Sequence, residues 1–380
     1  MKYLFSIGIG IGALLMIVGA ILWRQDIISR VLFMPKAPSG GTENALLPIS
    51  SPVAQKDREV VAENLDIPWE LVFLPDGSML VTERPGRLLK IRNAREVIPI
   101  AGVRHTGEGG LLGLALHPDF AQNHRIYVYV TAQSANTLIN RVEQYTLAGN
   151  SVTDRKVIVD NIPGSSLHDG GRIAFGPDKK LYITTGDAGN EKNAQNTSSL
   201  AGKILRVNDD GSIPEDNPFK NAVYSYGHRN VQGIAWDAAG SLWATEHGPS
   251  GTGSGFDEVN LITKGRNYGW PDIQGNESKA GMEAPIANSG SRDTWAPSGI
   301  AVIGDELLFA GLRGQSLYKA TIVADRIEDM SVHLREQFGR LRTVVVGPDQ
   351  QLYILTNNTD GRGKPRAGDD KIIRINPQAL

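Results

Sequence analysis

Short runs of alternating apolar and polar residues recur between residues 61 and 376, and this two-residue period predicts β-strands. Each unit begins with a turn signal that is followed by one alternating run, a loop and a second alternating run. First runs include LPDGSMLVTE (74–83), GPDKKLYITTGD (176–187) and GPDQQLYILTNN (347–358). Second runs include GRLLKIRN (86–93) and DKIIRINP (370–377). One turn aspartate falls in each unit, namely Asp76, Asp119, Asp178, Asp237, Asp305 and Asp349.

Six such units predict an all-β fold, a six-bladed β-propeller that spans residues 61–380 as one domain. Every second side chain of a strand would then pack between neighbouring blades. A large β-sandwich, or two separate all-β domains, is the alternative. The segment EVVAENL (59–65) is expected to complete the last blade beside the C-terminal strand.

The N-terminus has a different pattern. From Tyr3 to Trp23 no side chain is charged, and this length matches the ~20 residues that a helix needs to span a bilayer. Residues 1–33 are therefore predicted to be an N-terminal transmembrane anchor or signal helix, and residues 34–60 a linker rich in Pro, Ser and Gly. We expect export to the periplasmic or extracytoplasmic face, with anchoring to the cytoplasmic membrane by residues 3–23. A cleaved signal is the alternative reading.

Composition narrows the possible chemistry. The formal net charge is -2, which gives no sign of the basic surface that nucleic-acid binding requires. The chain contains 0 cysteines, so thiolate catalysis and cysteine-ligated metals are excluded. Any metal must therefore be held by oxygen atoms or imidazole.

Candidate chemical groups lie on loops at the predicted axial end of the propeller. His168 precedes a strand in a Gly-rich loop, and imidazole has a pKa suited to a general base. Arg229, Arg313 and the pair Arg340 and Arg342 come from three different units, and guanidinium groups aimed at one axis suit a small polyanion. For a hard cation the loops offer the carbonyls of Gly248 and Pro249 and the acids Asp257 and Glu258. Each of these residues could instead be an ordinary solvated loop residue.

Four segments carry a resemblance to a known family. They are GEGGLLGLALHPDF (107–120), SSLHDGGRIAFGPDKKLYITTGD (165–187), the loops from GHRN (227–230) to NYGWP (267–271), and GRLRTVVVGPDQQLYILT (339–356). Together they resemble the soluble quinoprotein sugar dehydrogenases of the glucose/sorbosone dehydrogenase family, in particular the aldose sugar dehydrogenases. The resemblance implies an oxidoreductase that oxidises the anomeric C1 hydroxyl of aldoses to lactones with pyrroloquinoline quinone (PQQ) and Ca²⁺.

The resemblance also implies roles for individual residues. His168 would take the proton of the C1 hydroxyl while a hydride passes to PQQ, and Arg229 would polarise the quinone carbonyl. The implied cofactor-binding residues are Glu108, Arg229, Asn230, Arg313, Arg340 and Arg342. The implied metal ligands are Gly248, Pro249, Glu258 and Tyr268. Trp295 would line the sugar pocket.

The chain departs from the family pattern at two of these positions. Glu108 stands where relatives carry a glutamine, and Leu167 stands where they carry an acid before the base. An orienting partner for His168 must therefore come from elsewhere, and the role of Glu108 is left open.

The expected partners are an aldose substrate, an external electron acceptor and, through the N-terminal segment, a membrane. A non-catalytic sugar- or protein-binding propeller and a calcium-dependent lactonase are the alternatives.

Overall fold

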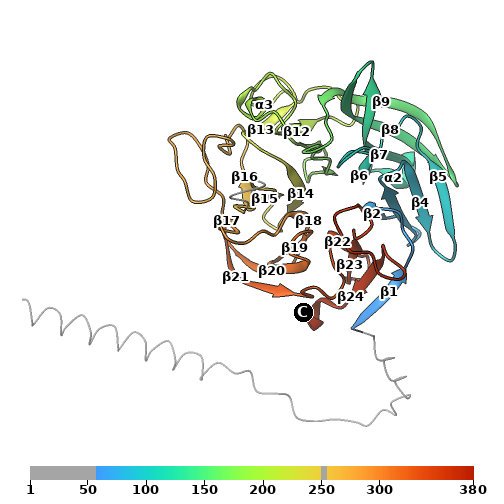
Figure 1. The fold of residues 1–380 in the computed structure, drawn as a ribbon. Helices are drawn as coiled ribbons and strands as arrows, with labels where there is room; N and C mark the ends of the chain where they lie inside the picture. The colour runs from blue at the N-terminus through green and yellow to red at the C-terminus, as the bar shows by residue number, and fades with distance from the viewer. Residues whose placement is uncertain (1–56, 250–254) are drawn as a thin grey trace, which may run out of the picture. The chain divides into compact units, whose positions relative to one another are not determined.

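The computed structural model describes residues 57–249 and 255–380. Within these residues the strands form six four-stranded antiparallel sheets, which stand around a central axis like the blades of a propeller (Figure 1). The predicted six-bladed propeller is therefore confirmed. The predicted anchor or signal segment (1–33) and most of the predicted linker lie outside the described residues. No helix in the described part of the chain is long and apolar enough to cross a membrane.

Each blade runs outward from an innermost strand. Blade 1 contains β2 (Pro68–Phe73), β3 (Met79–Glu83), β4 (Arg87–Ile91) and β5 (Arg95–Pro99). Blade 2 contains β6 (Leu111–Leu116), β7 (Arg125–Ser134), β8 (Thr137–Ala148) and β9 (Ser151–Pro163). Blade 3 contains β10 (Ile173–Phe175), β11 (Leu181–Thr185), β12 (Lys203–Val207) and β13 (Val223–Tyr226). Blade 4 contains β14 (Val231–Trp236), β15 (Leu242–Glu246), β16 (Glu258–Ile262) and β17 (Ala287–Asn288). Blade 5 contains β18 (Pro297–Ile303), β19 (Glu306–Gly311), β20 (Ser316–Val323) and β21 (Arg326–His333). Blade 6 contains β22 (Leu341–Val346), β23 (Leu352–Thr356), β24 (Ile372–Ile375) and β1 (Arg58–Ala62). The described helices are the single turns α2 (Phe120–Asn123), α3 (Lys192–Gln195) and η1 (Pro377–Ala379).

Blade 6 combines both ends of the described chain. Strand β1 pairs with β24 in antiparallel register, with Arg58 opposite Ile375 and Val60 opposite Ile373. The prediction that residues 59–65 complete the last blade is therefore confirmed, although β1 begins slightly before the predicted start of the propeller at residue 61. Figure 1 shows the first described strand beside the last, which closes the ring.

The core lies between the blades because every second side chain of a strand points to a neighbouring sheet. The described residues contain six buried apolar clusters, and each mainly joins one adjacent pair of blades. Leu80 of blade 1 packs with Val128 of blade 2, and Tyr353 of blade 6 packs with Leu71 of blade 1. Burial of this kind stabilises the fold by roughly 25 cal/mol per Å² of apolar surface.

The turn aspartates mark one end of the ring. All six lie between the first and second strands of their blades, and side chains among them accept hydrogen bonds within the turn. Asp178 Oδ1 accepts from the Lys180 N–H at 3.0 Å, and Asp349 Oδ1 accepts from the Gln351 N–H at 3.2 Å. At the other end, the chain enters each innermost strand and leaves each second strand. That opposite end carries the candidate site.

Candidate active site

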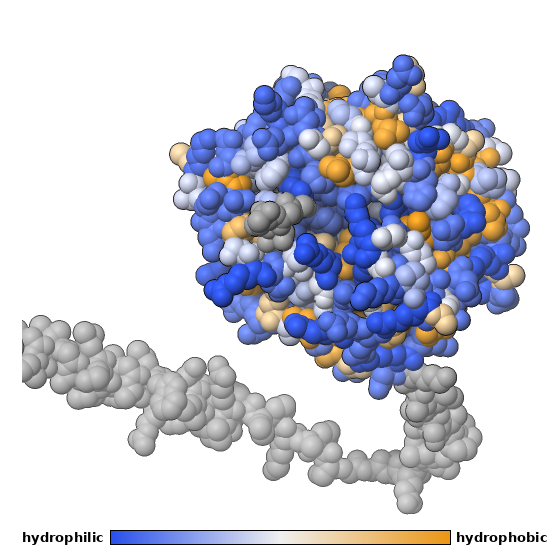
Figure 2. Space-filling model, viewed as in Figure 1, coloured by the Kyte–Doolittle hydropathy of each residue, from blue (hydrophilic) through white to orange (hydrophobic). Residues whose placement is uncertain are grey.

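A cavity of about 350 Å³ opens at this end of the propeller. Most of the residues selected from the sequence line it together, namely Glu108, His168, Gly248, Pro249, Arg313, Arg340 and Arg342. They come from blades 2 to 6, on loops that enter a first strand or leave a second strand, except Arg342, which lies in β22 itself. Hydrophilic residues gather around the middle of the face shown in Figure 2.

His168 is held by a carboxylate of its own blade. Its Nδ1 lies 2.7 Å from Asp187 Oδ1, an oxygen that also accepts the Gly189 N–H at 2.8 Å. The other oxygen of Asp187 accepts from Trp270 Nε1 at 2.9 Å. Burial acts to raise the pKa of Asp187, but the hydrogen bonds that its carboxylate accepts from His168, Gly189 and Trp270 help to outweigh burial, and the pKa is lowered. Because an ionised carboxylate only accepts, Nδ1 carries the hydrogen and Nε2 is left as a proton acceptor.

Two arginines of blade 6 line the same cavity. Arg342 is buried, and its guanidinium donates to the neutral acceptors Gln232 Oε1 and Asn357 Oδ1 at 2.7 and 2.8 Å. Burial lowers the pKa of Arg342 to about 9, and the nearby Arg84 and Arg340 cations act in the same direction. Arg340 contacts Asp360 at 3.1 Å.

The cavity wall carries an excess of positive charge. Among the described residues that line it, four are arginines (Arg313, Arg340, Arg342 and Arg362) and two are acids (Glu108 and Asp257). The carboxylate of Asp257 is already occupied, because it accepts the N–H groups of Gly248, Trp295 and Ala296 at 2.9, 2.7 and 2.9 Å. This excess of guanidinium groups fits a small ligand with several negative groups.

Arg229 and Asn230 lie beside this cavity, in the loop that enters blade 4. Arg229 lines a second cavity of about 420 Å³, which shares His168 and Pro249 with the first. Its guanidinium stands over the Trp270 ring at 5.3 Å and donates to the His247 carbonyl at 3.3 Å. Asn230 Oδ1 accepts the Gly170 N–H at 3.0 Å. Its Nδ2 is buried and has no hydrogen-bond partner among the described residues.

The four residues selected as metal ligands lie around two adjoining spaces. Gly248 and Pro249 line the main cavity and also a small cavity of about 10 Å³ next to it. Glu258 and Tyr268 line only the small cavity, together with Glu246. The described residues contain no cluster of three or more His, Asp or Glu side chains able to hold a metal ion, so backbone carbonyls would have to supply part of any ligand set.

Trp295 occupies a different place from the one expected. Its side chain is buried between blades 4 and 5, with ring centroids 5.4 Å from Phe309 and 5.6 Å from Tyr318, and it does not line either large cavity. An aromatic residue in a loop sequence is equally suited to anchor that loop in the core. Trp270 is the tryptophan beside His168.

Comparison with known proteins shows the family of this chain. Residues 65–373 match the Glucose / Sorbosone dehydrogenase family. The chain belongs to this family. It is 32% identical to the aldose sugar dehydrogenase YliI of Escherichia coli, over 80% of this chain and 90% of the relative.

Two solved structures of the family are similar throughout the propeller. The PQQ-bound aldose sugar dehydrogenase of Streptomyces coelicolor is 39% identical with a TM-score of 0.78, over 83% of this chain and 97% of that one. A proposed oxidoreductase (glucose dehydrogenase) of Thermus thermophilus is 43% identical with a TM-score of 0.80, over 83% and 98%. The resemblance seen in the sequence is confirmed.

Several residues of this glucose/sorbosone dehydrogenase-family site were missed in the sequence, and most follow a second strand. Asp187 and His247 lie just beyond the ends of β11 and β15, and Asp360 and Arg362 lie in the loop after β23. A shared signal was available, because these second strands each contain a threonine at or near the end, at Thr185, Thr245 and Thr356. Asp187, His247 and Arg362, which follow such a threonine, each line one of the two large cavities.

Proposed function

We propose that this protein is a PQQ-dependent aldose dehydrogenase that oxidises the C1 hydroxyl of aldose sugars to the lactone. The observation that carries the proposal is one cavity whose wall contains His168, which Asp187 holds, together with arginines of blades 5 and 6. The family relationship supports the same reaction class. Bound PQQ would supply the two-electron acceptor that the protein's own side chains lack.

The cavity fits such a cofactor by its donor chemistry. PQQ carries three carboxylates, and Arg340, Arg342 and Arg313 offer guanidinium groups at the wall. His247 lines this cavity, and its buried Nε2 has no hydrogen-bond partner among the described residues. Burial lowers the pKa of His247 to about 4, so its ring is neutral near pH 7. Unpartnered buried polar atoms are costly, and a polar ligand would satisfy them.

The chain's own residues account for proton removal and charge stabilisation. His168 Nε2 is the proposed acceptor for the proton of the sugar hydroxyl, and Asp187 stabilises the resulting imidazolium through Nδ1. Arg229 is proposed to stabilise negative charge that develops next to Trp270. Arg340 and Arg342 position the ligand, since their own contacts fix both guanidinium groups.

We propose calcium for the adjoining small cavity and for the carbonyls of Gly248 and Pro249. Calcium prefers six to eight oxygen ligands, including backbone carbonyls, and a space of about 10 Å³ accepts one small ion. Burial and the neighbouring Glu246 carboxylate raise the pKa of Glu258 to about 8, and a bound cation would offset both effects. The predicted export and membrane anchoring depend on residues outside the described part of the chain, so both stay predictions.

The test is reconstitution of the purified protein with PQQ and Ca²⁺, followed by addition of an aldose and an artificial electron acceptor. Reduction of the artificial acceptor should require the protein, PQQ, Ca²⁺ and the aldose together. His168→Gln should lower kcat by about 10²- to 10⁴-fold while PQQ affinity stays near the wild-type value. The proposal is wrong if PQQ binds and no aldose is turned over.

A further inference from the structure

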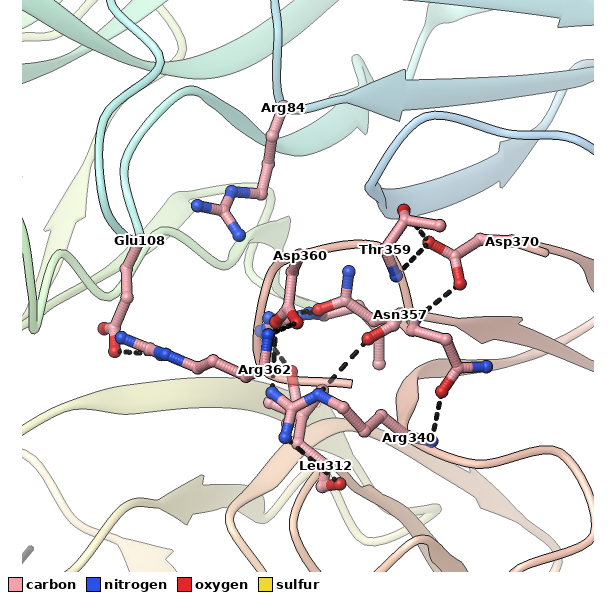
Figure 3. A network of polar contacts seen from close by, with 12 residues as sticks. Arg84, Glu108, Leu312, Arg340, Asn357, Thr359, Asp360, Arg362 and Asp370 are labelled. Carbon is pink, nitrogen blue, oxygen red and sulfur yellow. Dashed lines mark hydrogen bonds and ion pairs between the residues drawn. The ribbon is translucent and has the colours of Figure 1, made fainter. Parts of the chain in front are cut away.

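The carboxylate of Glu108 joins the base loop of blade 3 to a loop of blade 6. Its Oε2 accepts the backbone N–H of His168 at 2.9 Å, and its Oε1 lies 2.7 Å from the Arg362 guanidinium. Figure 3 shows Arg362 reaching from the loop after β23 toward Glu108 on the facing loop. The Glu108 side chain is 17% exposed and that of Arg362 is 55% exposed. One acid therefore touches both the backbone of the proposed base and a cation at the cavity rim.

The loop that carries Glu108 packs directly on the loop that carries His168. The Glu108 N–H donates to the Ser166 carbonyl at 2.9 Å. At Gly107, with φ +55°, an added Cβ would lie 1.9 Å from the same carbonyl oxygen. Only glycine permits this approach, so the two loops are in direct backbone contact. The loop of Glu108 is therefore held against the loop of His168 by a backbone contact at Ser166, just before the proposed base.

The backbone of His168 needs such support. It has φ +57°, in the left-handed region that residues other than glycine adopt at a cost. Three contacts hold it, namely the Glu108 carboxylate on its N–H, the Ala188 N–H on its carbonyl at 3.2 Å, and Asp187 on its ring. Asp187 fixes the ring and Glu108 fixes the N–H.

The contacts of Glu108 also explain why an acid stands there. Both carboxylate oxygens accept from donors, whereas a glutamine has one accepting oxygen and a donating NH₂ group. With Arg362 present, a glutamine would turn its oxygen to the guanidinium and its NH₂ to the His168 N–H, or the reverse. One donor would face another donor in either case.

We propose that Glu108 is a positioning residue that holds the backbone of His168 in its left-handed conformation, and that its negative charge is needed because Arg362 occupies its second oxygen. The effect on catalysis rests on the proposed function, in which His168 is the base. The positioning itself does not depend on it.

The test measures hydrogen exchange of the His168 amide in the full chain without added cofactor. Glu108→Gln should accelerate this exchange by about tenfold, the effect of losing one hydrogen bond to a charged acceptor. Arg362→Gln alone should leave it unchanged. The double variant E108Q/R362Q should return it to near the wild-type rate, because the introduced glutamine side chain can then turn its oxygen to His168. Glu108→Ala should lose protection with or without Arg362.

The matched control is the ion pair between Glu306 and Lys319, 3.1 Å apart on blade 5 and outside both large cavities. E306Q, K319Q and their double variant should leave His168 exchange unchanged. Wild-type protection in E108Q, or a double variant that exchanges as fast as E108Q, overturns the proposal. If E108Q does not fold, the double variant decides alone, since it must fold and protect the amide.

A second measurement separates this inference from the proposed function. After reconstitution at saturating PQQ, kcat should follow the same order as amide protection, with the double variant above E108Q. If exchange follows the expected order and no variant turns over aldose, the positioning role stands and the proposed activity fails. If exchange does not follow that order while the wild type turns over aldose, only the positioning role fails.

Discussion

At the scale of single residues, His168 depends on neighbours that lie far away in the sequence. Asp187 follows it on the same blade, but Trp270, which holds the second oxygen of Asp187, comes from the loop beyond blade 4's third strand. The sequence suggested His168 as a base because imidazole is rare and sits in a Gly-rich loop. It did not identify Asp187 as the partner, because the pairing forms only when the two axial loops of blade 3 lie side by side.

Asp187→Asn should show whether Asp187 orients the His168 ring without contributing to PQQ binding. The amide would donate to Nδ1 and move the ring hydrogen to Nε2, which removes the proposed proton acceptor. We expect kcat for aldose oxidation to fall by about 10²- to 10⁴-fold with PQQ affinity changed little, measured by steady-state kinetics and by titration. Asp154→Asn, at an exposed position of β9, is the control and should behave like the wild type. Equal kcat values for the Asp187 variant and the wild type would contradict the assigned role.

Asp169 should make stability depend on pH. It is 1% exposed, and burial raises its pKa to about 7. An unfolded chain releases this proton near pH ~3.9, so the folded state binds more protons between about pH 4 and 7. The free energy of unfolding from this group therefore falls as pH rises through that range, by a few kcal/mol in total.

Asp169→Asn should remove this component of the pH dependence, since an amide does not titrate. The measurement is urea unfolding of both proteins at about pH 4.5, 6 and 8, which bracket the titration. The variant should gain stability relative to the wild type as pH increases. A constant difference between the two proteins across the series would show that Asp169 is ionised throughout.

At the scale of elements, strands were predictable and the functional loops were only partly so. The two-residue period and the turn aspartates located the strands, because both are local properties of the chain. The loop after β23 has no such period, yet it brings Asp360 to Arg340 and Arg362 to Glu108 (Figure 3). Its position follows from the hydrogen bonds that anchor it, which sequence alone does not reveal.

Asp370 is the main anchor of this loop. It accepts from the Thr356 hydroxyl at 3.0 Å and from the backbone N–H groups of Asn358 and Thr359. Asp370→Ala should lower the free energy of unfolding by about 2–4 kcal/mol because buried donors lose their acceptor. It should also expose residues 357–371 to proteolysis and weaken PQQ binding. Asp325→Ala, on an exposed turn of blade 5, is the control, and equal stability of the two variants would rule out the anchor.

At the scale of the whole molecule, the ring depends on strand β1. Without it, β24 would present an unpaired edge, which favours opening and aggregation. A chain that begins at residue 57 should fold, whereas one that begins at residue 66 should melt at least about 5 °C lower, as measured by calorimetry. Equal melting temperatures would show that ring closure by β1 adds no stability.

Ring closure also determines when, in the course of its synthesis, the protein can bind its cofactor. The cavity takes its wall from blades 2 to 6, and blade 6 needs a strand from each end of the described chain. A nascent chain still attached to the ribosome lacks the arginines of the last blade for most of its synthesis. Cofactor binding through these arginines therefore has to follow the synthesis of the last blade.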